Sequence, residues 1–435
     1  MGDGRRIWRL LGVWASALLL GSGCASMRMH NPNPDLRPCT DAFATTADGW
    51  RLGIRHIRPQ SPDPGKYPVV LCHGLGLNGS FWTITDNHLP SQLAARGYEV
   101  FVVDLRGSGA SHRVGAVGQI NRVLRQTPLN ELGEGNWTMD DNAAYDVPAI
   151  LNYVRAATGS PRVNWIGHSL GGMLLYPYLE LSPERDRIAN YVGMGATAIL
   201  ADVPQTDMLR ANRGLRVLLL GMSTGRFARP MMFARLPGMS RIDQFYYSYE
   251  NVDRRTISRF YGYTLENPGR GALKQLDPYL EFGHLYSADG KTDYSTLLGL
   301  VKTPTLLVAG DSDVMSDIAS TQMTFEALGS PDRSLLRFGR LEGQVADYGH
   351  CDLVWSRHAP NEIFPVIGDW LDRHQPGSAT GQEQSEAFSA APALSDPAAR
   401  LASQKAVDAD LRPRLEPLAL PGQKVDRDKP RLGQP

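Results

Sequence analysis

The sequence has no excess of charge of either sign, because 45 basic residues balance 45 acidic ones. A chain without net charge lacks the electrostatic attraction that draws proteins to polyanions, so DNA and RNA are not expected partners. Cysteine is scarce, with four residues in 435, and no spacing is typical of a zinc or iron–sulfur site. We therefore expect no metal, no disulfide framework, and a small or lipid-like substrate.

Near the N-terminus the sequence has an apolar stretch over residues 10–20 that is too short to span a bilayer comfortably. It follows Arg5, Arg6 and Arg9, and this order predicts an export signal over residues 1–23. The signal ends in LGSGCAS, which resembles the box before the lipidated cysteine of bacterial lipoproteins. The resemblance implies a membrane anchor through a lipid on Cys24 and a place in the cell envelope.

An outer-membrane lipoprotein or a periplasmic protein is therefore expected. A plain secretory signal, a membrane anchor, and twin-arginine export through the tandem Arg5-Arg6 are the alternatives for this segment.

Composition divides the rest of the chain into three parts. Residues 24–40 are rich in Pro and Asn and predict a tether. Residues 376–435 are rich in Pro, Ala, Gln and mixed charge, and Phe388 is their only aromatic residue. Such a tail cannot bury enough apolar surface to offset the entropy of ordering it, so we expect it to be disordered. The folded domain is expected over residues 41–375.

Within this domain, short apolar runs alternate with helical patterns, which is typical of a mostly parallel sheet covered by helices on both faces. The runs are residues 67–72, 98–104, 162–167, 188–193 and 305–309. Residues 200–298 interrupt the alternation and are rich in Met and aromatic residues, which suit a deformable apolar pocket wall. We expect a helical cap there that covers the substrate, and an ordinary helical subdomain is the alternative.

A helix is predicted before the third run. Thr138 and Asp141 have the spacing of a capping box, and apolar residues follow at helical intervals up to Val154. Pro148 stands inside this pattern and is expected to kink the helix.

The strongest motif is residues 167–171, which read Gly-His-Ser-Leu-Gly. A G-x-S-x-G sequence between a strand and a helix makes a sharp turn that lifts the serine hydroxyl above the sheet. Residues 162–167 supply the strand and a helical pattern follows. The context therefore predicts Ser169 as a nucleophile.

A serine nucleophile needs a base to take its proton and an acid to orient that base. His350 lies after the last strand-like segment and before a final helical pattern, and His358 is the competitor. Asp311 and Asp313 both follow the run 305–309, and the usual spacing of Gly, two residues, then Asp selects Asp313. We expect Asp311 to cap the next helix instead.

The oxyanion that forms during acyl transfer needs two backbone N–H donors. Leu170, directly after the nucleophile, is expected to supply one, and Leu75 in the loop after the first run the other. His73 is interpreted as a structural residue of that loop. Asp104 and Arg106 are expected to hold a nearby turn by hydrogen bonds.

Five further segments resemble one known family. They are residues 46–52 (TADGWRL), 73–75 (HGL), 93–98 with Arg106-Gly107, 145–149 (YDVPA) and 350–355 (HCDLVW). Together they resemble the acid lipase branch of the α/β hydrolases, which includes gastric and lysosomal lipases. The likeness runs over residues 42–373, apart from the cap.

The resemblance implies the α/β-hydrolase fold, a Ser–Asp–His triad of Ser169, Asp313 and His350, no cofactor, and fatty-acyl ester substrates. The chain departs from the family at Leu170, where the family has Gln. We expect a serine hydrolase that cleaves lipid-like carboxylic esters through an acyl-enzyme. A polyester- or other acyl-acting hydrolase of this fold, and a non-catalytic envelope lipoprotein that binds a partner or lipid, are the alternatives.

Overall fold

The computed structural model describes residues 39–115, 135–203, 207, 210–212, 214 and 245–376, and the structural statements below concern these residues. By its contacts the chain divides into two compact units, Met1–Ala391 and Pro392–Pro435, and all described residues lie in the first. The predicted export signal, Cys24, and nearly all of the predicted tether and tail lie outside the described residues.

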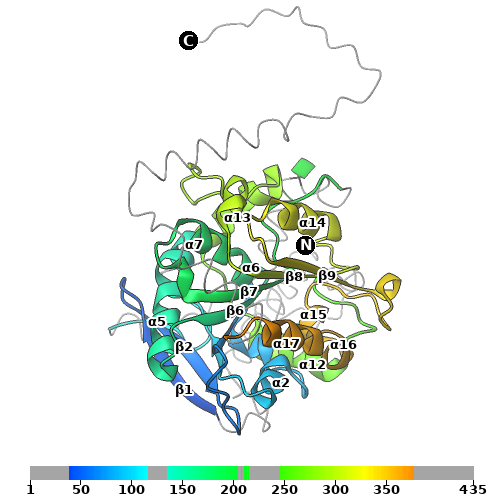
Figure 1. Cartoon of the computed structure of the whole chain (residues 1–435). Helices are drawn as coiled ribbons and strands as arrows, with labels where there is room; N and C mark the ends of the chain where they lie inside the picture. Colours follow the sequence, from blue (N-terminus) through cyan, green and yellow to red (C-terminus); the bar gives the residue numbers. More distant parts are fainter. Residues whose placement is uncertain are drawn as a thin grey trace, which may run out of the picture. The chain divides into compact units, whose positions relative to one another are not determined.

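One nine-stranded sheet organises the described unit, with the order β1-β2-β4-β3-β6-β7-β8-β9 and β5 paired to β2 (Figure 1). Strand β2 is antiparallel to β1, β4 and β5, and the pairs from β4 through β3, β6, β7 and β8 to β9 are parallel. The predicted fold class is therefore confirmed. The strands are β1 (Cys39–Thr45), β2 (Trp50–Ile57), β3 (Val69–Cys72), β4 (Val100–Val103), β5 (His112–Arg113), β6 (Val163–His168), β7 (Ile188–Met194), β8 (Thr305–Gly310) and β9 (Arg333–Phe338).

Helices and single turns connect the strands. The α-helices are α2 (Leu89–Ala95), α4 (Met139–Asp141), α5 (Val147–Thr158), α6 (Leu170–Met173), α7 (Leu175–Leu181), α12 (Arg254–Arg259), α13 (Arg270–Phe282), α14 (Ile318–Ala327), α15 (Asp352–Trp355), α16 (Ala359–Glu362) and α17 (Phe364–Arg373). The 3₁₀ segments are η1 (Gly79–Trp82), η4 (Arg185–Arg187), η6 (Tyr294–Leu300) and η7 (Arg340–Glu342), and the π-helical segments are η3 (Asn142–Asp146) and η5 (Phe260–Thr264).

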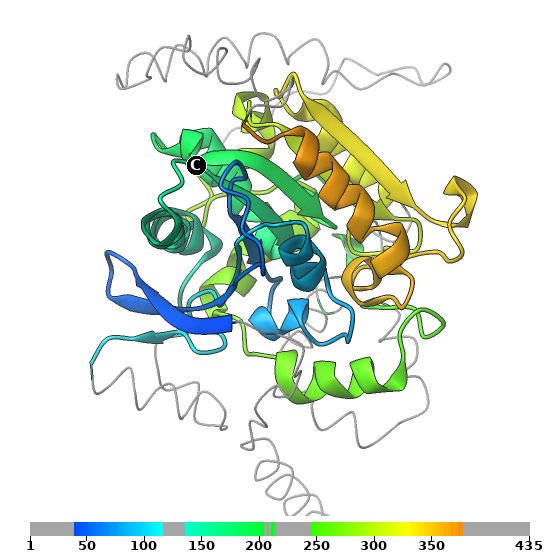
Figure 2. The ribbon, with the colours of Figure 1, turned by 60° about the horizontal axis from the view of Figure 1, so that its bottom comes forward.

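Successive side chains of a strand point to opposite faces of the sheet, and both faces are covered by helices. In β3, Val70 and Cys72 belong to a core cluster shared with α5, α7 and α13, whereas Val69 and Leu71 belong to a second cluster shared with α2 and α15–α17. Figure 2 shows α2 and α17 together over the second face. This burial explains why the central strands read as continuous apolar runs.

The five predicted apolar runs correspond to β3, β4, β6, β7 and β8. Thr138 caps α4 in a capping box with Asp141, as predicted. Pro148 lies inside a helical stretch that runs without a break from Met139 to Thr158, and a π segment over Asn142–Asp146 precedes it. A π segment is a common site of a helix bend, so this irregularity occurs where the proline predicts a disturbance of the helix.

Between β7 and β8 the structure describes α12, η5, α13 and η6 of the predicted cap, while Met208, Met222, Met231, Met232 and Met239 lie outside the described residues. Among the described residues no helix combines the length and apolar character needed to cross a bilayer.

Candidate active site

Ser169 stands at a sharp turn between β6 and α6. Its φ of 53° and ψ of −126° make it the only described non-glycine residue with a positive φ. Backbone strain of this kind costs about 1–3 kcal/mol and persists only where the surroundings enforce it. The N–H of Ser169 donates to the carbonyl of Met194 at 2.9 Å, which fixes the turn at the carboxyl ends of β6 and β7.

Two glycines make this turn possible. A Cβ atom on Gly167 would lie 2.2 Å from the carbonyl oxygen of Gly171, and one on Gly171 would lie 2.4 Å from the carbonyl oxygen of Cys72. Any side chain at either position would therefore force the strand and the helix apart. The glycines of the motif are required by this close approach of backbones.

His350 and Asp313 meet at the carboxyl ends of the parallel strands. His350 Nδ1 lies 2.8 Å from Asp313 Oδ2, and both side chains are buried. The other carboxylate oxygen of Asp313 accepts the N–H groups of Met315 and Ser316, each at 2.9 Å. Burial opposes ionisation of Asp313, but the charge of His350 and these hydrogen bonds outweigh it, so the pKa of Asp313 is lowered.

The remaining ring nitrogen of His350 is available for chemistry. Nε2 is buried and has no hydrogen-bond partner among the described residues, and His350 and Ser169 line the same cavity. In the tautomer whose Nδ1 donates to Asp313, Nε2 is the unprotonated nitrogen and can accept a proton. The arrangement can therefore deprotonate a hydroxyl in the cavity.

The two competing residues lie elsewhere. His358 directly precedes α16 and does not line the cavity. Asp311 lies 3.6 Å from Arg337 on β9 and does not contact His350. The expectation that Asp311 caps the next helix is wrong: Asp317 caps α14 by accepting the N–H of Ser320, because an N-cap residue must directly precede its helix.

Leu75 and Leu170 both line the cavity. Neither backbone N–H donates to another group in the described part of the chain. A Cβ on Gly74 would lie 3.1 Å from the Cβ of Ser169, so the loop that carries Leu75 passes close to the nucleophile. The structure thus brings both predicted oxyanion donors to the cavity with their N–H groups available.

That loop is held by buried polar contacts. His73 Nδ1 lies 2.9 Å from the carbonyl of Gly74, and its Nε2 lies 3.2 Å from the N–H of Leu105. Asp104 accepts the N–H groups of Gly79 and Ala110, each at 2.7 Å. The predicted structural roles of His73 and Asp104 are confirmed, since these contacts join the Leu75 loop to the segment after β4.

Arg106 lies in the segment after β4 and forms two ion pairs there. Its guanidinium pairs with Asp48 and with the fully buried Asp146, each at 2.8 Å. The hydrogen-bonding role predicted for Arg106 is therefore confirmed.

Two residues near His350 were not singled out in the sequence. His168 Nε2 lies 2.9 Å from the carbonyl of His350, and its ring packs on Phe81. Burial and the neighbouring His350 lower the pKa of His168 to about 3, so its ring stays neutral and donates Nε2–H to that carbonyl. Its place inside the G-x-S-x-G motif was the available signal.

Asp352 is the second such residue. Its carboxylate accepts the N–H of Gly349 at 3.1 Å and the amide of Asn251 at 2.8 Å, which anchors the loop that carries His350. Burial raises the pKa of Asp352 to about 6, against the opposing effect of these hydrogen bonds. The loop that carries His350 is therefore held by His168 at the carbonyl of His350 and by Asp352 at the N–H of Gly349.

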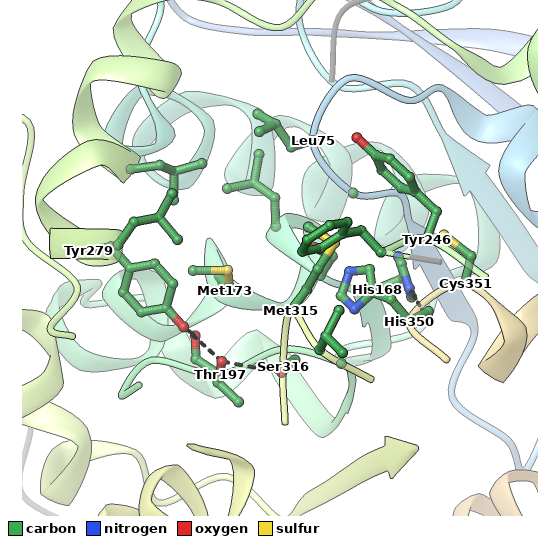
Figure 3. Close-up of a pocket in the computed structure, with 18 of the residues that line it drawn as sticks. Leu75, His168, Met173, Thr197, Tyr246, Tyr279, Met315, Ser316, His350 and Cys351 are labelled. Atoms are coloured by element: carbon green, nitrogen blue, oxygen red, sulfur yellow. Dashed lines mark hydrogen bonds between the residues drawn. The ribbon is translucent and has the colours of Figure 1, made fainter. Parts of the chain in front are cut away.

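The cavity is largely apolar (Figure 3), and residues that follow β6, β7 and β8 line it. The cavity has a volume of about 130 Å³. Helix α13 contributes to its wall, as do the loops after β3, β7 and β8. Its described lining residues are Gly74, Leu75, Leu77, His168, Ser169, Leu170, Met173, Gly195, Thr197, Leu200, Phe245, Tyr246, Leu276, Tyr279, Leu280, Val314, Met315, Ser316, His350 and Cys351. No group of three or more His, Cys, Asp or Glu side chains suited to a metal ion occurs in the described ranges.

Known proteins share this architecture. A family model described as alpha/beta hydrolase fold matches residues 67–356. A probable lipase of Schizosaccharomyces pombe is 24% identical over 365 residues, covering 77% of each chain. Rat gastric triacylglycerol lipase is 24% identical over 364 residues, covering 75% of this chain and 87% of that protein. A solved membrane phospholipase A, at 16% identity and a TM-score of 0.51, covers 85% of this chain and 97% of its own.

Proposed function

Because the chain belongs to the α/β-hydrolase fold family, we propose that it is a serine hydrolase that cleaves carboxylic esters with a lipid-like acyl group. One observation carries the proposal. His350 Nδ1 contacts Asp313 at 2.8 Å while its buried Nε2 has no partner among the described residues, and the strained Ser169 lines the same cavity. These are the parts that activation of a serine hydroxyl needs.

In the proposed reaction, His350 Nε2 accepts the proton of the Ser169 hydroxyl as Oγ attacks the ester carbonyl carbon. The N–H groups of Leu75 and Leu170 donate to the developing oxyanion. Nε2 then transfers its proton to the alkoxide oxygen, the C–O bond breaks, and the alcohol leaves. Water gives a proton to Nε2 as its oxygen attacks the acyl carbonyl carbon. The bond between the acyl carbon and Oγ then breaks and Nε2 returns the proton to Oγ, which releases the carboxylic acid and restores Ser169.

Two findings support a lipid-like acyl group. Leucine, methionine, valine and aromatic side chains make up most of the cavity lining, and such a wall favours hydrocarbon over polar groups. The relatives at 24% identity include proteins named as lipases. We accordingly propose that the chain belongs to the acid lipase branch and that residues 200–298 form the substrate-covering cap, from which α13 reaches the cavity.

The test is hydrolysis of p-nitrophenyl esters by the purified full chain. Ser169→Ala should lower kcat by at least about 10⁴-fold, because the acyl-enzyme can no longer form. Ser160→Ala is the matched control, since Ser160 lies in the turn between α5 and β6, outside the cavity, and should leave kcat unchanged. Equal turnover by Ser169→Ala and the unmodified chain would contradict the proposal.

A further inference from the structure

The cavity has two chemically different ends. In Figure 3, His168, His350 and Cys351 lie at one end, Tyr279 and Thr197 lie at the other, and Met173 and Met315 lie between them. The first end holds the proposed catalytic groups. An acyl chain bound to Ser169 would therefore extend past the two methionines toward Tyr279.

Tyr279 closes this second end. It comes from helix α13 of the cap region, its side chain is 5% exposed, and its neighbours Leu276 and Leu280 on the same helix also line the cavity. Tyr279 belongs to the core cluster that includes Ala196, Ala198 and Leu285. Among the described residues, Tyr279 is therefore both part of the cavity lining and part of the packed core.

The ring of Tyr279 is held in place by hydrogen bonds. Its hydroxyl donates to the carbonyl of Thr197 at 3.0 Å and lies 2.7 Å from Thr197 Oγ1. Ser316 Oγ donates to the same Thr197 Oγ1 at 3.2 Å. Burial raises the pKa of Tyr279, against the effect of Thr197, so the phenol keeps its proton. Each hydroxyl proton has an acceptor inside this group, which fixes the ring.

The sides of the cavity differ from its end in stiffness. Met173 and Met315 are unbranched and adopt many rotamers, so they adjust to chains of different width. A buried aromatic ring with both of its hydroxyl contacts satisfied cannot move aside without breaking hydrogen bonds. The width of the site is therefore adaptable, whereas its depth is fixed.

We propose that Tyr279 determines acyl-chain length, so that the substrate is an ester whose acyl chain ends against the Tyr279 ring. This inference rests on the proposed function. It makes Tyr279 a specificity-determining residue: it contacts the far end of the acyl chain and takes no part in the bond changes at Ser169.

The experiment measures kcat/KM of the full chain on p-nitrophenyl esters of unbranched acids of increasing length. Each methylene that becomes buried should raise kcat/KM about fourfold until the chain reaches Tyr279, after which kcat/KM should fall. Tyr279→Ala should move the maximum to longer chains. Tyr279→Phe retains the ring but loses the hydroxyl contacts that hold it, so it should move the maximum less than Tyr279→Ala does. Lys274→Ala, an exposed change on the same helix, is the control.

A second variant guards against misfolding of Tyr279→Ala. Leu280→Phe adds volume to the cavity wall at the residue that follows Tyr279 on α13, and it should move the maximum to shorter chains. Folded Tyr279→Ala or Leu280→Phe with an unmoved maximum would overturn the inference, as would an unmodified chain whose kcat/KM has no maximum. If instead no ester is turned over, or Ser169→Ala is as active as the unmodified chain, the proposed function itself fails.

Discussion

Asp311 and Asp313 are separated by a single residue, yet only Asp313 contacts His350, at 2.8 Å. Asp313→Asn replaces an acceptor with an amide that cannot stabilise the protonated imidazole, so kcat should fall by about 10⁴-fold. Asp311→Asn is the matched control, because Asp311 pairs with Arg337 on β9, and it should retain kcat within about tenfold. Ester hydrolysis by both variants checks this, and a reversed order of the two effects would contradict it.

Sequence reasoning located Ser169 and Asp313 by their spacing after a strand, and His350 by its place after the last strand-like segment and before the final helix. It could rank Asp313 above Asp311 by spacing alone, but the direction of each carboxylate depends on contacts with residues far along the chain. The contact of His168 with the carbonyl of His350, 182 residues later, could not be predicted for the same reason. Spacing places a residue at the carboxyl end of a strand, but it does not determine which residues its side chain contacts.

Helix α7 carries a buried carboxyl that the proposed reaction does not use. Glu180 is 2% exposed, and neither of its carboxylate oxygens has a hydrogen-bond partner among the described residues. Burial, with a smaller effect of the Asp293 charge, raises its pKa well above the ordinary value of 4.5. The folded chain therefore keeps a proton on Glu180 that the unfolded chain releases above about pH 4.5.

This difference makes Glu180 destabilising as pH rises. Above about pH 4.5 the unfolded chain binds fewer protons than the folded one, so the stability contribution of this group falls with increasing pH. Glu180→Gln removes the titration, and its Tm should exceed that of the unmodified chain by an amount that grows from pH 5 to pH 8. Glu326→Gln, an exposed change on α14, should give a constant difference. A difference for Glu180→Gln that does not change with pH would refute this assignment.

The elements that sequence analysis missed lie mainly at the sheet edges. Strands β1 and β9 end the strand order, and each contains exposed or half-buried residues along most of its length. An edge strand has fewer covering contacts and so lacks the continuous apolar run of a central strand. Central strands such as β3, buried at all four residues, were predictable because burial on both faces fixes their composition.

The predicted export signal and Cys24 lie outside the described residues and are interpreted from the sequence alone. We propose that Cys24 carries a lipid anchor in the cell envelope. When the chain is expressed in bacteria with an alkyne-tagged fatty acid, the mature protein should carry the label, and Cys24→Ala should lose it. Cys39→Ala changes an exposed free cysteine of β1 and should keep the label. Equal labelling of Cys24→Ala and the unmodified chain would rule out lipidation at Cys24.

The family of the whole molecule follows from a match over residues 67–356, whereas relatives at 24% identity leave the acyl group to be tested. The proposed ester hydrolysis depends on activation of Ser169 by His350. Peptide mass mapping after treatment with a fluorophosphonate tests this most directly. We predict one adduct, on Ser169, that His350→Ala loses. An adduct elsewhere with Ser169 unmodified, or full labelling of Ser169 in His350→Ala, would contradict the account.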